Sequence, residues 1–152
     1  MRSLFAVALG LAVGLSTVAA PGKGKEDKDD LKKLAGDWTV AAWTQGGNDL
    51  DRDRLDTAKW SVKGDKYTFE MGGNMEEGKL KLDPSKKPAV ADLEITEGND
   101  KGKGQPGIYK IDGDTITFCL AAPGGKDRPK DFTSTEDDMQ ILVVMKRKKK
   151  ED

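Results

Sequence analysis

Carboxylates are the most abundant reactive side chains of this 152-residue sequence, and their usual catalytic companions are scarce. Asp and Glu total 27, His is absent, and Cys119 is the single cysteine. The commonest general base and metal ligand are therefore missing, and neither an internal disulfide nor a cysteine-rich zinc site can form. The sequence also lacks nucleophile-elbow, phosphate-loop and zinc-protease motifs. Catalysis would depend on carboxylates, one of them in an apolar setting that raises its pKa.

Asp92 and Glu94 are the best candidates for such carboxylates, because they alternate with apolar residues along a predicted strand. Because successive side chains of a strand point to opposite faces, both carboxylates should lie on the outer face and be exposed to solvent. We therefore predict no catalytic residues, no cofactor and no enzyme activity.

A second acidic pattern, Asp49-x-Asp51-x-Asp53, imitates the start of a calcium-binding loop. The sixth position of such a loop should be Gly and is Arg54, and the twelfth should be Glu and is Trp60. The segment thus lacks both the sharp turn and the bidentate carboxylate that calcium needs. We predict a solvated, helix-capping acidic segment and no metal site.

The thiol of Cys119 is the remaining candidate nucleophile. It lies within a predicted strand and has no His to activate it. We interpret it as a small packed side chain, with a reactive thiol as the less favoured alternative.

Basic residues form one cluster, at positions 146–150, which could contact anionic lipid or nucleic acid. Acidic residues follow it at once, and the formal net charge of the whole chain is −1. We predict that the cluster is mostly a solvated tail and that nucleic acid is not a partner.

The elements that position these residues begin after an N-terminal segment, 1–20, with the three-part layout of a secretory signal peptide. Arg2 supplies the positive start, the run 4–18 is uncharged and largely apolar, and small residues follow. An uncleaved membrane anchor is the alternative, but the run is short of the roughly 20 residues that a span needs. We predict cleavage after Ala19, contact with the membrane only during export, and a periplasmic or extracellular protein.

The mature chain divides into a short leader, one domain and a tail. Residues 21–30 are polar with Gly and Pro and predict a disordered linker. The domain spans 31–148 and starts with a short helix over 31–34, and residues 149–152 form a charged tail. A second short helix is expected within 49–58.

Alternating apolar and polar residues predict that the rest of the domain is built from strands. The turn sequences between them agree, because Asp112-Gly113-Asp114 and Lys63-Gly64-Asp65 supply the glycine that tight hairpins demand. A long loop over 123–138 precedes the last strand. The predicted strands are 37–44, 59–63, 66–71, 76–82, 89–96, 106–111, 115–121 and 139–147.

Each strand has one apolar and one polar face, as period two requires. Among the inward sets are Trp38, Val40 and Ala42 on the first strand and Tyr67, Phe69 and Met71 on the third. About eight antiparallel strands with such faces form a closed barrel or a sandwich, and closure removes exposed edges. We predict an all-β fold, a small up-and-down antiparallel barrel with a short N-terminal helix.

Two features sharpen this prediction. Gly36-Asp37-Trp38 opens the first strand after a polar helix and resembles the G-x-W motif of lipocalins. In that family an Arg near the end of the last strand packs over the Trp and closes one end of the barrel. Arg147 holds the matching position, so the resemblance implies that it covers Trp38 in a contact of about 0.5–2 kcal/mol.

A wider set of motifs, over about residues 31–149, is similar to an uncharacterised lipocalin-like domain family that recurs in Planctomycetes proteins. The resemblance implies the fold and an exported location, and it brings no established activity. The motifs, in order, are Leu34-x-Gly36-x-Trp38, Gly107-Ile108-Tyr109, Asp112-Gly113-Asp114, Cys119, Arg128-Pro129, Phe132 and Val144-x-Lys146-Arg147.

Candidate ligand-binding residues are inward-facing aromatic side chains and one loop arginine. A barrel of about eight strands is either filled by side chains or holds one small ligand, and the sequence leaves this open. Arg128 either binds an anion or hydrogen-bonds loop carbonyls, and the following Pro129 and Phe132 favour anchoring. The candidates are Trp38, Tyr67, Tyr109, Phe118 and Arg128, with Gly36, Trp38 and Arg147 closing the barrel.

The leading functional hypothesis is therefore non-catalytic binding of a small, partly apolar molecule by an exported monomer. The alternative is an envelope interaction or structural module that binds a protein or polysaccharide through the loops 45–58 and 123–138.

Overall fold

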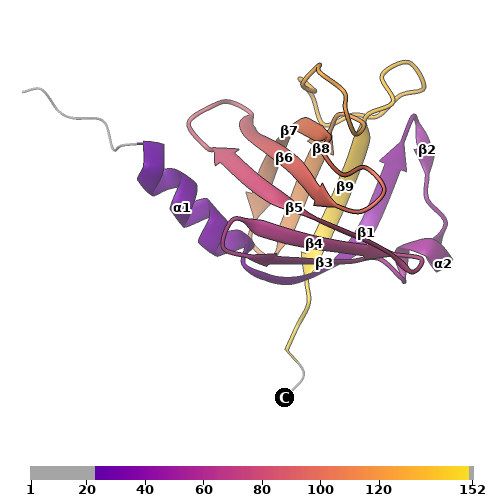
Figure 1. The fold of residues 1–152 in the computed structure, drawn as a ribbon, viewed down its shortest axis with the longest axis horizontal. Coiled ribbons are helices and arrows are strands. Elements are labelled where there is room, and N and C mark those ends of the chain that lie inside the picture. The colour runs from indigo at the N-terminus through magenta and orange to yellow at the C-terminus, as the bar shows by residue number, and fades with distance from the viewer. Residues whose placement is uncertain (1–22, 151–152) are drawn as a thin grey trace, which may run out of the picture.

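The computed structural model describes residues 23–150, and the predicted signal peptide (1–20) lies outside this range. Neither helix in the described range is long and apolar enough to cross a membrane. In chain order the elements are α1 (Lys23–Leu34), β1 (Gly36–Gln45), β2 (Asn48–Asp49), α2 (Arg52–Leu55), β3 (Lys59–Lys63), β4 (Lys66–Met71), β5 (Asn74–Asp83), β6 (Ala89–Glu97), β7 (Gly104–Asp112), β8 (Thr115–Leu120) and β9 (Ile141–Arg147) (Figure 1).

The strands form a closed antiparallel barrel, as the sequence predicts. β1 and then β3 to β9 follow one another around the sheet, and β9 pairs again with β1, so eight strands close the ring. β2 is a two-residue extension that pairs with the end of β1. Closure satisfies the backbone groups that an open sheet would leave at its two edges.

The hairpin turns form where Asp-Gly and Lys-Gly sequences predict them. Gly64 and Gly113 have φ values of +63° and +58°, which glycine adopts without the steric penalty of a side chain. These turns set the pairing of β3 with β4 and of β7 with β8. The register then places the alternating apolar residues inside the barrel.

The first strand departs from the predicted alternation. A β-bulge between Val40 and Ala42 adds one residue opposite β9, so the side chains beyond it change faces. Ala42, predicted to point inward with Trp38 and Val40, is exposed, and Trp43 points into the barrel instead.

The N-terminal helix is longer than predicted. Residues 23–30, expected as part of a disordered linker, form the first turns of α1. Leu31 and Leu34 pack on the core, and the Tyr109 hydroxyl donates to the Asp30 carboxylate over 2.7 Å. These tertiary contacts stabilise a helix that extends into residues 23–30, whose polar sequence predicts a linker, because packing supplies most helix stability in proteins.

Candidate ligand-binding cavity

A cavity of about 290 Å³ lies inside the barrel, towards the end formed by the C-terminal part of β1 and the first residues of β9. It is partly open to solvent and mostly apolar. Its aromatic lining comes from four strands and consists of Trp43, Trp60, Tyr67, Phe69 and Phe118.

The aromatic rings contact one another and form a continuous wall. Trp43 stacks on Phe69 with centroids 5.5 Å apart, and Trp60 meets Phe118 edge to face at 5.4 Å. Trp60 also lies 6.2 Å from Tyr67. These are favoured arrangements of aromatic pairs, so contacts among the rings themselves hold the wall in place.

Glu76 on β5 is a half-buried carboxylate that lines the cavity. The Tyr67 hydroxyl donates a hydrogen bond to Glu76 Oε1 over 2.9 Å. Burial, and secondarily the charge of Asp100, raise the pKa of the Glu76 carboxyl, and the Tyr67 bond offsets this only in part. Burial and the adjacent carboxylate raise the pKa of Tyr67 far above its usual value, so the phenol stays a donor.

Gly78 makes the bond between Tyr67 and Glu76 sterically feasible. It lies opposite Tyr67 across β4 and β5, and a Cβ there would lie 2.4 Å from the Tyr67 ring and 2.5 Å from a backbone carbonyl. No side chain fits in that space, so glycine lets the tyrosine ring lie across the strand.

Two other polar residues of the lining, Asp100 and Gln105, already have partners. Asp100 pairs with Lys103 at 2.7 Å, and the Gln105 side-chain amide donates to the Ala121 carbonyl over 3.1 Å. No Lys or Arg lines the cavity, so its formal charges are those of Glu76 and Asp100.

We expect Glu76→Gln to make the protein at least as stable at pH 7 as the unchanged chain. A carboxyl whose pKa is raised by folding favours the folded state below its unfolded pKa, and that advantage is lost as pH rises through the folded pKa. Glutamine removes the buried charge and keeps an oxygen for Tyr67. The difference in unfolding free energy between variant and parent, measured by urea denaturation, should shrink as pH falls towards 3.

The matched control is Glu77→Gln on the neighbouring, exposed position. It should show no such pH dependence. A Glu76→Gln difference that stays constant from pH 7 to pH 3 would contradict the burial of this carboxylate.

The opposite end of the barrel is closed by the predicted contact. The Arg147 guanidinium lies 4.3 Å from the centre of the Trp38 ring and donates to the backbone carbonyls of Ala35 and Lys33. Trp38 Nε1 donates to the Leu34 carbonyl over 2.8 Å. A Cβ at Gly36 would lie 3.2 Å from Arg147, so the glycine gives the arginine room.

Two of the predicted ligand-binding residues line the cavity and three do not. Tyr67 and Phe118 contribute to its wall. Trp38 belongs to the closed end, and Tyr109, although its ring packs 6.1 Å from Phe118, uses its hydroxyl to hold α1.

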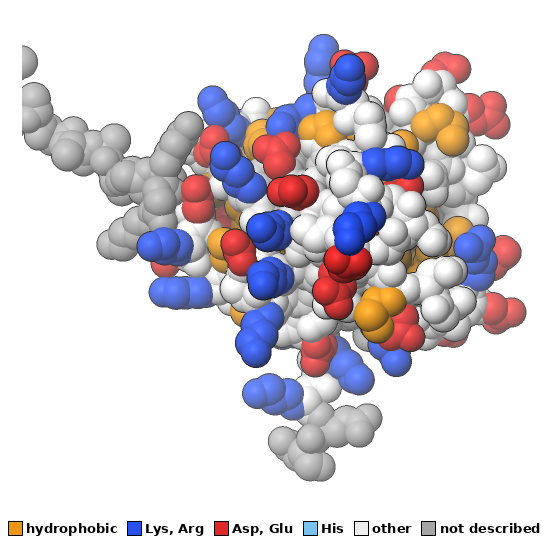
Figure 2. All heavy atoms as spheres, viewed as in Figure 1, with side chains coloured by type: hydrophobic (Ala, Val, Ile, Leu, Met, Phe, Trp, Pro, Cys, Tyr) orange, Lys and Arg blue, Asp and Glu red, His pale blue; other side chains and the backbone are white. Residues whose placement is uncertain are grey.

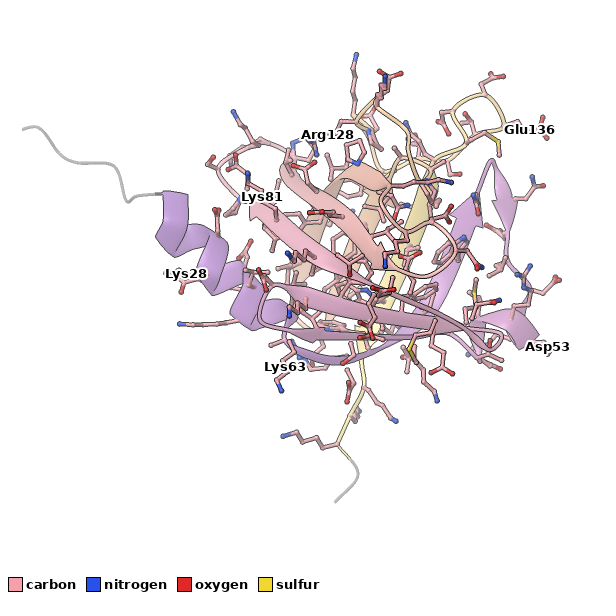
Figure 3. All side chains as sticks on the ribbon, in the orientation of Figure 1. Lys28, Asp53, Lys63, Lys81, Arg128 and Glu136 are labelled. Carbon is pink, nitrogen blue, oxygen red and sulfur yellow. The ribbon has the colours of Figure 1, made fainter. Side chains whose placement is uncertain are left out.

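Arg128 lies outside the barrel (Figure 3). Its guanidinium donates to the carbonyls of Ala91 at 3.1 Å and Gly107 at 2.8 Å and pairs with Asp92 at 2.7 Å. The anchoring interpretation is therefore right in kind, but the carbonyls belong to β6 and β7 rather than to the loop. Arg128 ties the long loop to the outer face of the barrel.

The same loop covers Cys119. The thiol is fully buried on the outward side of β8 and donates to the Thr133 carbonyl over 3.2 Å. Burial raises the pKa of the Cys119 thiol, which disfavours the reactive thiolate. The interpretation as a packed side chain is thus confirmed.

Four residues of the aromatic wall and its carboxylate are absent from the candidates predicted from the sequence: Trp43, Trp60, Phe69 and Glu76. Phe69 was predicted to face inward but not to bind a ligand. Trp43 was hidden by the bulge, which no local pattern reveals. Trp60 was assigned to a strand but to neither face, although Val62 two residues later marks the inward side. The position of Glu76 could have been predicted, because it lies an even number of residues before Gly78, Leu80 and Leu82, which all face the inside of the barrel.

Fold and site together define a lipocalin-like β-barrel with one end closed by an arginine–tryptophan contact and a cavity near the other. Comparisons with models of known protein families, with curated proteins and with solved structures found no match.

Proposed function

We propose that this protein is an exported, non-catalytic binding protein that holds a small, partly apolar molecule inside its barrel. The cavity of about 290 Å³ is the observation that carries the proposal. An engineered apolar cavity of about 150 Å³ holds one benzene molecule, so this one has room for about a dozen non-hydrogen atoms.

The distribution of apolar surface supports binding inside the barrel rather than on its exterior. Basic and acidic side chains are interspersed over the face shown in Figure 2, and apolar side chains appear there only in small patches. Five aromatic side chains line the cavity. Enclosed aromatic walls with a few polar groups are typical of small-molecule sites.

Catalysis has one observation in its favour, the raised pKa of Glu76 beside a cavity. A hydrolytic site also needs a nucleophile or a second acid–base group held next to it. The nearest candidate in the lining, Asp100, is paired with Lys103. Binding therefore accounts for more of the geometry than acid–base chemistry does.

A surface module acting through the loops 45–58 and 123–138 has less support. Arg128 and Phe132, the residues best suited to grip a partner, contact the barrel itself, the ring of Phe132 lying 4.6 Å from Lys110 Nζ. The two loops also hold each other, since the Gly47 amide donates to Ser134 Oγ over 3.2 Å.

Filling the cavity should abolish binding without unfolding the protein. Val143 lines the cavity from β9, and Val143→Phe adds a ring where space exists, so we expect the affinity for the probe 4-phenylbutanol to fall at least about tenfold. The measurement is a titration of the protein with 4-phenylbutanol, in which tryptophan fluorescence reports binding because Trp43 and Trp60 line the cavity.

Val144→Phe is the matched control, because the adjacent side chain lies on the other face of β9 and is only half-buried. It should bind the probe like the parent. Equal affinity of the parent and of Val143→Phe would overturn the proposal that the cavity is the binding site.

A further inference from the structure

We infer that the cavity selects a small aryl- or alkylamine, whose ammonium group binds at Glu76 while its apolar body occupies the aromatic wall. This inference rests on the proposed binding function and specifies the chemical class of the ligand.

The charge of the cavity points to a cation. Of the residues that line it, only Glu76 and Asp100 carry formal charge, and both are acidic. Asp100 has a basic partner, Lys103 at 2.7 Å, but no Lys or Arg in the part of the chain that the structure describes pairs with Glu76. A half-buried carboxylate without a basic partner is an energetic cost that a bound ammonium would relieve.

The geometry of Glu76 leaves it ready to accept a further donor. Tyr67 is its one described hydrogen-bond donor and contacts Oε1. A carboxylate has about four acceptor sites, so capacity for a ligand N–H remains. The bond from Tyr67, made possible by Gly78, also holds the carboxylate in one orientation towards the cavity.

The walls next to this carboxylate suit a cationic ligand as well. Tyr67, which contacts Glu76, lies 6.2 Å from Trp60, and both rings line the cavity. Aromatic faces attract an ammonium through their quadrupole, and the attraction grows when water is excluded. A site with aromatic faces and one fixed carboxylate recognises a cation through both.

Other ligand classes fit these observations less well. A carboxylic acid would bring a second negative charge next to Glu76, which like-charge repulsion disfavours. A neutral apolar ligand would remove water from Glu76 and leave its charge without compensation. An amine of about a dozen non-hydrogen atoms satisfies both the volume and the charge.

The test uses three probes with one body and three head groups: 4-phenylbutylamine, 4-phenylbutanol and 4-phenylbutanoate. Each probe is titrated at pH 7 into the parent protein and into the variants Glu76→Gln and Glu77→Gln. Tryptophan fluorescence and calorimetry are the readouts. We expect the amine to bind the parent at least about tenfold more tightly than the alcohol, and the carboxylate to bind most weakly.

Glu76→Gln should lower the affinity for the amine about tenfold, because it removes the charge and keeps the shape. It should not lower the affinity for the alcohol, which has no charge to lose a partner. Glu77→Gln, an exposed neighbour, should behave like the parent. Denaturation curves of the variants verify that each is folded.

The two proposals fail in different ways. If the alcohol or the carboxylate binds as tightly as the amine, or if Glu76→Gln leaves the preference unchanged, the amine inference is overturned and the binding function stands. If none of the three probes binds the folded parent, the binding function itself is overturned.

Discussion

Arg147→Ala is expected to lower the unfolding free energy by about 2–3 kcal/mol. The substitution removes the cation from the Trp38 ring and leaves the carbonyls of Ala35 and Lys33 without their donor. The ion pair with Asp114 adds little, because that carboxylate is 85% exposed. Urea denaturation should show a midpoint lower by about 1–2 M.

Lys146→Ala is the control for this prediction. Lys146 precedes Arg147 on β9, and its side chain is exposed. Its replacement should move the midpoint little. If the two variants unfold at the same urea concentration, the closing contact does not stabilise the barrel and Trp38 is held by its packing alone.

Arg128→Ala should release the long loop and expose Cys119 to thiol reagents. The arginine donates to the carbonyls of Ala91 and Gly107, and hydrogen bonds from a charged donor are worth about 1.5–3 kcal/mol before solvent screening. A loss of about 2 kcal/mol in the free energy of loop opening corresponds to labelling about 30-fold faster.

The measurement is the rate at which Cys119, the single cysteine, reacts with an aromatic disulfide reagent under native conditions. Lys130→Ala, an exposed position two residues away, should label like the parent protein. An Arg128→Ala rate within about twofold of the Lys130→Ala rate would show that other contacts hold the loop down. Circular dichroism of the unlabelled variants separates local opening from global unfolding.

These contacts divide the barrel into a closed end and an end that contains the cavity. Trp38, Arg147 and the last turn of α1 close one end, while Glu76 and the aromatic wall occupy the other half of the interior. Substitutions at the closed end should therefore act mainly on stability. Substitutions at Glu76 and Val143 should act mainly on what the cavity holds.

The strands and the turns are predictable from the sequence because they depend on neighbours along the chain. Alternation of side chains defines a strand, and the Gly64 and Gly113 turns define where it reverses. The contact of Trp38 with Arg147 was available only through resemblance to lipocalins, because more than one hundred residues separate the two.

The sequence predicts some of the cavity residues and not others. On β5 every second residue from Leu80 back through Gly78 to Glu76 faces the inside of the barrel. The alternation of a strand therefore predicts that this carboxylate points inward. The same rule fails at Trp43, because one additional residue in the bulge inverts the faces beyond it. A bulge is a property of the pairing between β1 and β9, and no single segment contains it.

The sequence by itself determined the all-β class of fold, since local alternation and turn chemistry suffice for antiparallel strands joined by hairpins. Only the tertiary structure decided that the barrel contains a cavity, that α1 extends to Lys23 and that Arg128 anchors a loop. The physical reason is that these features depend on how side chains from distant strands share one volume. The space left among Trp43, Trp60 and Phe118 follows from the closure of the sheet around them.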